Sequence, residues 1–172
     1  MKWLCLGLFL FYPVFSRCEN LDFKEKGQLI LTPSKDWELK KNVMGFPYIL
    51  FSPHIMGQRS NLSFLASGDN FEFEVASMKK NQDQFKQLKI NWAEKIGAKI
   101  DEVFPYKSEL NSKGHRVNSI GVKYTHNNKH YIEKSYYIEC RGKMYFSKVL
   151  SSDANFQHTK LADEMIKGID CE

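Results

Sequence analysis

The pattern of hydrophobic and polar positions divides the chain into an apolar leader, several strand-like stretches and two stretches with helical spacing. Residues 3–12 are apolar all round, follow Lys2, and lead into Pro13-Val14-Phe15-Ser16. A secretory signal consists of a positively charged start, a short apolar run and a cleavage site with small residues, and residues 1–16 have all three. The run is shorter than the ~20 residues that a transmembrane helix needs. We therefore expect cleavage after Ser16, a periplasmic or secreted protein, and no transmembrane segment in the mature chain.

Two other interpretations of the leader remain open. Cys18 is the position that lipid modification would use, but the bulky Phe15 and the charged Arg17 fit a lipoprotein site poorly. A buried amphipathic first helix would need a polar face, which residues 3–12 lack. Export with cleavage is the expectation that we carry forward.

The first half of the mature chain has three strand-like stretches. They cover residues 28–32, 47–52 and 61–66, and Pro33 ends the first because proline cannot donate to a ladder. The turn at 33–36 delivers Trp37, a side chain large enough to cover one end of a core. Phe71 and Phe73 alternate with acids, which predicts that extended structure continues there.

A change of period at residue 76 predicts one long amphipathic helix over 76–96, ending near Gly97. Its apolar positions recur at helical intervals: Met78, Phe85, Leu88, Trp92 and Ile96. Such a stripe is usually a core face, and a groove for a partner is the alternative.

The second half predicts extended segments over 100–110, 115–126, 130–140 and 143–150, then a helix over about 155–169. The buried stripe of that last helix would be Leu161, Met165, Ile166 and Ile169. Turns are expected at 111–114, around Asn127-Asn128 and at Arg141-Gly142-Lys143. The apolar faces of successive strands lie opposite each other only if the connecting loop has an odd number of residues, most simply three. With such loops Ile138 and Cys140 would face Phe146 and Met144.

This order of elements predicts one α+β domain over residues 17–172. Its mainly antiparallel sheet would have about six or seven strands, with the long central helix and the C-terminal helix on one face or on opposite faces. The segment 31–37, with Pro33 four residues before Trp37, resembles the Pro-x-Gly-Trp start of the PsbP/DcrB-like α/β/α sandwich superfamily, with Asp36 in place of the glycine. The ending Met144-Tyr145-Phe146-Ser147, followed by a loop, Phe156 and an apolar helix, is similar to that family's close. The resemblance implies a sandwich fold and an accessory role. The superfamily includes photosystem subunits, Ran-binding import factors, envelope lipoproteins and secretion-effector chaperones, which share no catalytic residues.

Charge and cysteines narrow the functional classes. The chain carries a net charge of +5, and cleavage would remove one lysine and leave +4. The lysines are dispersed, so we expect no nucleic-acid partner. Of the three cysteines that survive cleavage, Cys140 lies in an apolar alternation and is expected to be a buried thiol. Cys18 and Cys171 lie at the two ends of the mature chain, and we expect them either to form a disulfide or to lie in frayed termini.

The candidate chemistry is sparse. His126 and His130 bracket the turn at 127–129, so they could supply half of a transition-metal site or simply lie in an exposed polar turn. No nucleophile elbow, redox motif or phosphate loop occurs, so we expect no enzyme activity, no cofactor and no bound metal. The tyrosines of the second half form a possible recognition face, or are strand aromatics: Tyr124, Tyr131, Tyr137 and Tyr145. We expect a non-catalytic accessory protein that binds a protein of the cell envelope or extracellular space. The alternatives are a carrier of a small ligand or lipid and, least favoured, a cryptic hydrolase.

Overall fold

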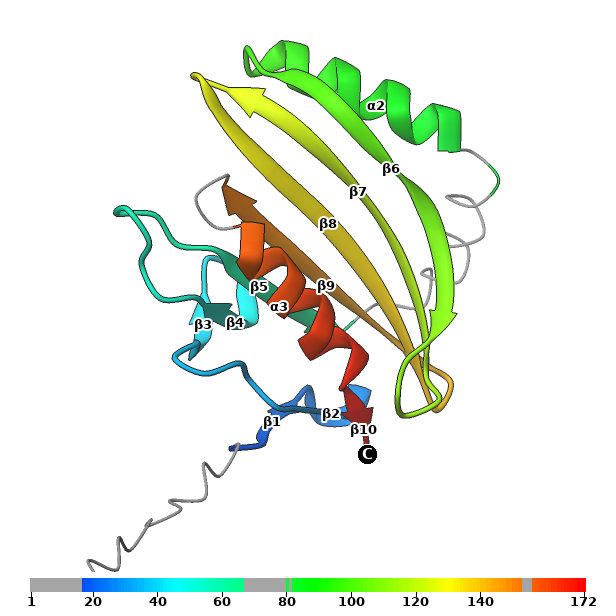
Figure 1. Ribbon diagram of the computed structural model, residues 1–172. Coiled ribbons are helices and arrows are strands. Elements are labelled where there is room, and N and C mark those ends of the chain that lie inside the picture. The colour runs from blue at the N-terminus through cyan, green and yellow to red at the C-terminus, as the bar shows by residue number, and fades with distance from the viewer. Residues whose placement is uncertain (1–16, 67–79, 81, 153–155) are drawn as a thin grey trace, which may run out of the picture.

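Two antiparallel sheets form the frame of the computed structural model, which describes residues 17–66, 80, 82–152 and 156–172 (Figure 1). The large sheet has seven strands in the order β3-β4-β5-β9-β8-β7-β6. Its strands are β3 (Glu38–Val43), β4 (Phe46–Phe51), β5 (Asn61–Ala66), β6 (Lys99–Leu110), β7 (Arg116–His126), β8 (Lys129–Cys140) and β9 (Lys143–Ser152). The small sheet joins β1 (Glu19–Asp22), β2 (Gln28–Leu31) and β10 (Asp170–Cys171), and the 3-10 turn η1 (Lys24–Lys26) links β1 to β2. The predicted antiparallel sheet of about seven strands is confirmed.

Two α-helices of the described residues, α2 (Gln82–Lys95) and α3 (Phe156–Lys167), cover opposite faces of the large sheet. Two successive residues of β8 show this, because neighbouring side chains on a strand point to opposite faces. The carboxylate of Glu133 accepts from Lys89 on α2 at 2.7 Å, whereas the ammonium of Lys134 donates to Asp163 on α3 at 2.6 Å. Of the two arrangements expected for the helices, the structure therefore has one helix on each face.

The main core lies between the large sheet and a second layer made of α3 and the small sheet. Leu29 and Leu31 of β2, Ile166 of α3 and Ile138 of β8 are almost fully buried there. Hydroxyl groups tie the small sheet to the large one: Tyr145 on β9 donates to the Lys26 carbonyl at 2.8 Å. Strand alternation and the apolar face of α3 thus enclose one continuous cluster.

The turn before Trp37 explains the departure from the family pattern noted in the sequence. Asp36 has φ 65°, in the left-handed region that favours glycine and that aspartate tolerates better than most residues. The amide of Trp37 closes the turn by donating to the Ser34 carbonyl at 3.1 Å. Trp37 itself is 7% exposed, belongs to the core cluster, and its ring contacts His158 edge-on.

The long central helix predicted over 76–96 is not confirmed. The helix α2 covers 82–95, and Met78, Phe71 and Phe73 lie outside the described residues. The predicted buried stripe is also wrong in part, because Leu88 is 60% and Ile96 is 40% exposed. The side chains that reach the sheet belong to a narrower face: Trp92 meets Tyr124 edge-on at 5.1 Å, and Ala93 is the one buried residue of α2.

The predicted three-residue hairpin loops are wrong. His126 pairs with Lys129, and Cys140 pairs with Lys143, so both loops have two residues. Both residues of each loop have positive φ, as type I′ turns require: 49° and 59° at Asn127 and Asn128, 49° and 74° at Arg141 and Gly142. The register shifts by one residue, and Ile138 lies opposite Tyr145 rather than Phe146.

The cysteine pairing also differs from the expectation. Cys171 forms a disulfide with Cys140, and Cys18 is a free, exposed thiol. The two Cα atoms of the bridge are 6.1 Å apart, because β10 runs beside β2 and brings the C-terminus to the end of β8. The N-terminal Cys18 lies one residue before β1, which is separated from β10 by β2. Neither the Cys18–Cys171 bridge nor the free Cys140 thiol is found.

Candidate functional site

A groove lies where the small sheet meets the β3–β4 edge of the large sheet. We call it the basic groove, and its volume is about 470 Å³. It is lined by Asp22, Phe23, Lys24, Lys26, Lys41, Asn42, Pro47, Tyr48, Leu65 and Ala66. These residues come from four separate parts of the chain: the β1–η1 segment, the end of β3, the start of β4 and the end of β5.

The apolar floor of the basic groove is held rigidly. The ring of Phe23 packs edge-on against Tyr48 at 5.2 Å and tilted against Tyr145 at 5.4 Å. The hydroxyl of Tyr48 donates to the Asp22 carbonyl at 2.7 Å, which joins the end of β1 to β4. Phe23 and Tyr48 are 9% and 7% exposed, so the floor is a fixed part of the fold.

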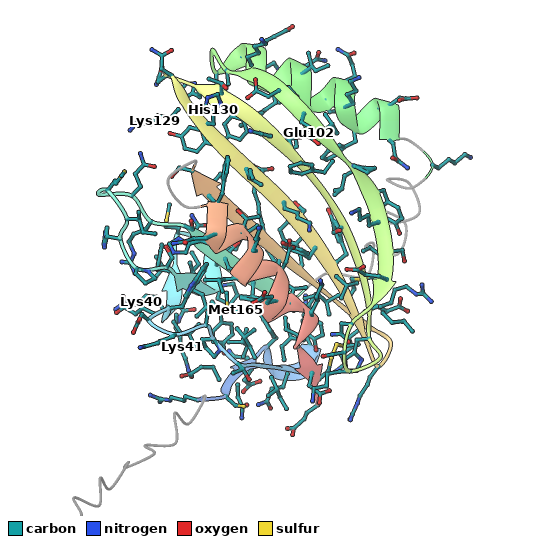
Figure 2. The ribbon with its side chains drawn as sticks, in the orientation of Figure 1. Lys40, Lys41, Glu102, Lys129, His130 and Met165 are labelled. Atoms are coloured by element: carbon teal, nitrogen blue, oxygen red, sulfur yellow. A yellow bond between two sulfur atoms is a disulfide. The ribbon has the colours of Figure 1, made fainter. Side chains whose placement is uncertain are left out.

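The rim of the basic groove is positively charged. Lys24, Lys26 and Lys41 are exposed lysines in the lining, and Asp22 is the one acid. The Asp22 carboxylate already accepts the Lys24 amide at 2.7 Å. The Lys41 ammonium lies 5.7 Å from the centre of the Tyr48 ring, within cation–π range. Figure 2 shows Lys40 and Lys41 together on this side of the molecule. The arrangement suits an acidic group placed over an aromatic surface.

The tyrosines do not form the exposed recognition face that the sequence suggested. Tyr124, Tyr137 and Tyr145 are 7%, 7% and 1% exposed. Tyr145 also lies on the opposite face of the sheet from Tyr137, because Tyr137 pairs with Phe146. Tyr131 is half-buried and stacks on Tyr124 at 5.2 Å. Burial raises the pKa of Tyr124 to about 12, so its hydroxyl stays protonated at neutral pH.

The two turn histidines do not form half of a metal site. His126 pairs with Lys129, and His130 pairs with Thr125, so the two rings project from opposite faces of the hairpin. Lys129 and His130 lie at the hairpin tip far from Lys40 and Lys41 (Figure 2). His130 Nδ1 lies 2.6 Å from Thr125 Oγ1, which donates to Asp101 Oδ2 at 2.7 Å. The two-residue turn, which changes the register, removes the predicted juxtaposition.

One histidine does lie beside serine hydroxyls, in the core under α3. Ser60 Oγ is 2.9 Å from Ser151 Oγ and 3.4 Å from His158 Nδ1. All three residues are at most 4% exposed, and no carboxylate among the described residues bonds His158. Burial lowers the pKa of His158, so the ring is neutral. A hydrolase needs a nucleophile that substrate can reach and an oriented base, and this cluster provides neither.

Two partly buried ion pairs connect the helices to the sheet and do not form a reactive site. Burial alone would raise the pKa of Glu133, but hydrogen bonds and charges from Lys89 and Lys148 outweigh it and hold that pKa below its usual value. On the other face, Tyr136 and Lys134 both donate to Asp163 Oδ1, at 2.5 and 2.6 Å. Burial, with the Asp163 charge, raises the pKa of Tyr136 well above its usual range.

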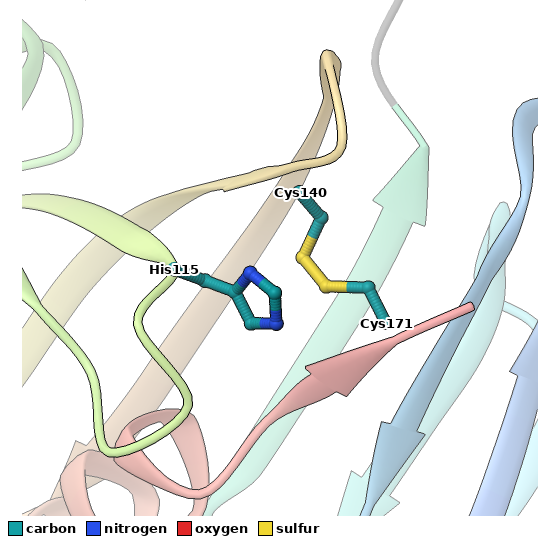
Figure 3. A group of neighbouring side chains, drawn as sticks. All are labelled: His115, Cys140 and Cys171. Carbon is teal, nitrogen blue, oxygen red and sulfur yellow. A yellow bond between two sulfur atoms is a disulfide. The ribbon is translucent and has the colours of Figure 1, made fainter.

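One group of side chains among the described residues could hold a metal ion: His115, Cys140 and Cys171 (Figure 3). Their ligand atoms all lie within 4.8 Å of one another, although the two sulfurs are bonded to each other. Sequence reasoning missed this group because the two cysteines come together only if Cys140 pairs with Cys171. That pairing depends on the order of the strands in the small sheet.

Comparison with known proteins identifies the fold. No protein-family model matches the chain, and no curated protein matches it. The structure of LpqN, involved in cell envelope biogenesis of Mycobacterium tuberculosis, superposes with a TM-score of 0.56 at 12% identity, covering 90% of each chain. The solution structure of cyanobacterial PsbP (CyanoP) from Synechocystis sp. PCC 6803 superposes with a TM-score of 0.50 at 12% identity, covering 99% of this chain and 98% of that one. The fold is PsbP-like.

The PsbP-like fold confirms the resemblance found in the sequence. At these identities the comparison establishes the architecture and carries over no functional residue. Within the described residues, no helix is long and apolar enough to cross a bilayer.

Proposed function

We propose that this chain is an exported, non-catalytic accessory protein of the cell envelope or extracellular space. In this proposal an acidic segment of a partner protein binds in the basic groove. Export rests on the leader-like residues 1–16, which lie outside the described residues. The envelope role agrees with the PsbP-like fold and with LpqN, whose structure is described as that of a protein of cell envelope biogenesis.

The observation that carries the proposal is the combination of charge and aromatic floor in one open groove. Three exposed lysines surround rings that the core holds in place, and the lining contains one acid. Acidic side chains of a partner would pair with the ammonium groups, and the apolar parts of the segment would cover Phe23 and Tyr48. Aromatic anchors surrounded by polar contacts are typical of protein interfaces.

Site-specific photo-crosslinking in the native compartment tests this proposal. A photo-reactive residue at Asn42, in the groove, should crosslink to one defined partner, and the same residue at Leu110, which is 63% exposed on β6, should not. The double charge reversal Lys24→Glu with Lys41→Glu should abolish the crosslink, whereas the matched reversal Lys95→Glu on α2 should leave it intact. Equal crosslinking at the two positions, or survival of the crosslink in the double variant, would refute the proposed groove function.

Export is tested separately, on the native protein. N-terminal sequencing after purification should find Arg17 as the first residue. A protein that still begins with Met1 would contradict the export part of the proposal.

A small-molecule carrier is the second candidate, because the volume of the basic groove falls within the range of ligand sites, about 300–1,000 Å³. The large aromatic side chains near the helices do not share one cavity, because Trp37 packs against His158 of α3 and Trp92 of α2 packs on the opposite face of the large sheet. Native mass spectrometry of the purified protein decides between the candidates: a co-purifying acidic small molecule, lost in the double charge reversal, would favour the carrier.

A further inference from the structure

The end of the molecule that carries the disulfide brings three metal-binding side chains together from three elements. His115 lies just before β7, Cys140 ends β8, and Cys171 belongs to β10. The two cysteines are 1% and 3% exposed, and the side chain of His115 is 17% exposed. The imidazole ring is turned toward the disulfide (Figure 3). The ring is therefore held beside two sulfur atoms in a largely dry environment.

A network of hydrogen bonds fixes the position of His115. The side-chain oxygen of Asn111 accepts from the His115 amide at 2.9 Å, and its amide group donates to the Ile169 carbonyl at 2.8 Å. The loop that carries the histidine is thereby tied to the segment that carries Cys171. In addition, His115 Nε2 lies 3.0 Å from Asp170 Oδ1, which also accepts the Cys171 amide at 2.8 Å. The histidine and the second cysteine thus share one carboxylate.

This arrangement has the parts of a thiolate metal site. A carboxylate that bonds one nitrogen of a histidine ring orients the ring and leaves the other nitrogen for a metal. The ligand atoms of the three residues lie within 4.8 Å of one another, close enough for one ion to bind all three. Zinc bond lengths are about 2.0 Å to nitrogen and 2.3 Å to sulfur, so two sulfurs on a tetrahedral zinc lie about 3.8 Å apart. Disulfide sulfurs are about 2.0 Å apart, so after reduction each sulfur must move by about 0.9 Å, which rotation of the two cysteine side chains supplies. A water molecule would take the fourth position.

We propose that the reduced form of this protein binds a divalent zinc-like ion through Cys140, Cys171 and His115, with Asp170 as the orienting carboxylate. Disulfide and metal exclude each other. A dithiol reductant supplies two electrons and two protons, the S–S bond breaks, two thiols form, and the reductant becomes a disulfide. Binding of the ion then releases the two thiol protons and forms two metal–sulfur bonds. The strand β10 has two residues, which pair with Ile30 and Leu29 of β2, and the Glu172 amide donates to the Gln28 carbonyl at 3.2 Å. Local opening of this short C-terminal segment would expose the bridge to the reductant. In both redox states the C-terminus stays tied to β8.

Cobalt(II) is the probe for the experiment, because thiolate–cobalt bonds absorb in the near ultraviolet. The full mature chain carries Cys18→Ser, so that the third thiol cannot contribute. After reduction and removal of the reductant without air, Co²⁺ should produce thiolate charge-transfer absorption at one equivalent. The oxidised protein should produce none. His115→Ala should weaken the binding at least tenfold, and Asp170→Asn should weaken it about tenfold, as outer-shell changes commonly do. The control His126→Ala, at the distant hairpin tip, should leave the affinity unchanged.

A thermal measurement provides a second readout. Zinc should raise the Tm of the reduced protein and leave the Tm of the oxidised protein unchanged, because a ligand stabilises only the state that binds it. If reduction alone unfolds the chain, the same titration followed by circular dichroism should show metal-dependent refolding. Absence of cobalt absorption in the reduced chain overturns the proposal. It is equally overturned if His115→Ala, folded when oxidised, binds Co²⁺ as tightly as the parent once reduced.

Discussion

Removal of the Cys140–Cys171 disulfide should lower the stability of the protein by an amount that the structure allows to be calculated. The bridge closes a loop of 31 residues that contains β9 and α3. Without the bridge the unfolded chain regains the entropy of that loop. The chain-entropy relation gives about 3.7 kcal/mol at 25 °C for 31 residues. For a domain of this size, that loss corresponds to a fall in Tm of about 7–15 °C.

The assay is urea unfolding, followed by far-ultraviolet circular dichroism in the presence of EDTA, of the Cys18→Ser parent and of the same chain with Cys140→Ala and Cys171→Ala. With a slope of about 2 kcal/mol/M, the midpoint should fall by about 2 M. Each single alanine variant should lose about as much as the double variant, because either one breaks the bridge. An unchanged midpoint, or single variants that each lose about half of the double variant's loss, would refute the pairing. Peptide mapping of the oxidised protein provides an independent check, since it should recover Cys140 linked to Cys171 and Cys18 as a free thiol.

Three further predictions test the packing of the sheet. Gly121→Ala should destabilise the protein by about 1–3 kcal/mol in urea unfolding, because the added Cβ would lie 2.6 Å from the Glu133 carbonyl oxygen. In the control Gly168→Ala the atom nearest to the added Cβ is 3.6 Å away, so this variant should lose less than about 1 kcal/mol. Because the pKa of Glu133 is lowered on folding, its ion pairs contribute stability above the unfolded pKa of about 4.3, and this stability is lost as the pH falls through the folded pKa. Glu133→Gln should therefore flatten the acid limb of a curve of Tm against pH, and a limb as steep as in the parent would contradict the ion-pair assignment. Burial also lowers the pKa of His158, so the neutral ring contributes stability above about pH 6.5 that is lost as the pH falls below that value. His158→Gln should therefore reduce the change in Tm between pH 6.5 and 5, and an unchanged slope would show that the ring is not buried as a neutral group.

Sequence periodicity was sufficient for the elements whose burial is regular. The stretch 61–66 was predicted at its observed bounds, and the four long strands of the second half were predicted to within two residues at each end. The helix α3 was predicted because its apolar positions repeat along one face that is buried in the folded protein. Periodicity failed for β3, in which no residue is buried, and for β1 and β10, which are too short to show a repeat. Such edge and terminal strands leave little hydrophobic signal in the sequence.

The register of the sheet was decided by turn geometry rather than by the apolar pattern. Matching apolar residues across the hairpins predicted three-residue loops, whereas Asn127-Asn128 and Arg141-Gly142 form two-residue turns. A change of one residue moves every partner along by one. The loss of the His126–His130 pair and the placement of Tyr145 away from Tyr137 follow directly from this change. Two register shifts between β6 and β7, at Ile100/Glu102 and Phe104/Lys107, are a further irregularity that no alternation predicts.

By itself, the sequence determined the sandwich class of the fold, the elements with a regular buried face, and the lack of a recognisable catalytic motif, because these depend on local periodicity and composition. Only the tertiary structure decided which cysteines pair, which residues line the basic groove, and which histidine lies beside the disulfide. Those features join segments that are up to 56 positions apart, as His115 and Cys171 are. Contacts across such separations are set by the order of strands and the closure of layers, and neighbouring residues in the sequence carry no record of them.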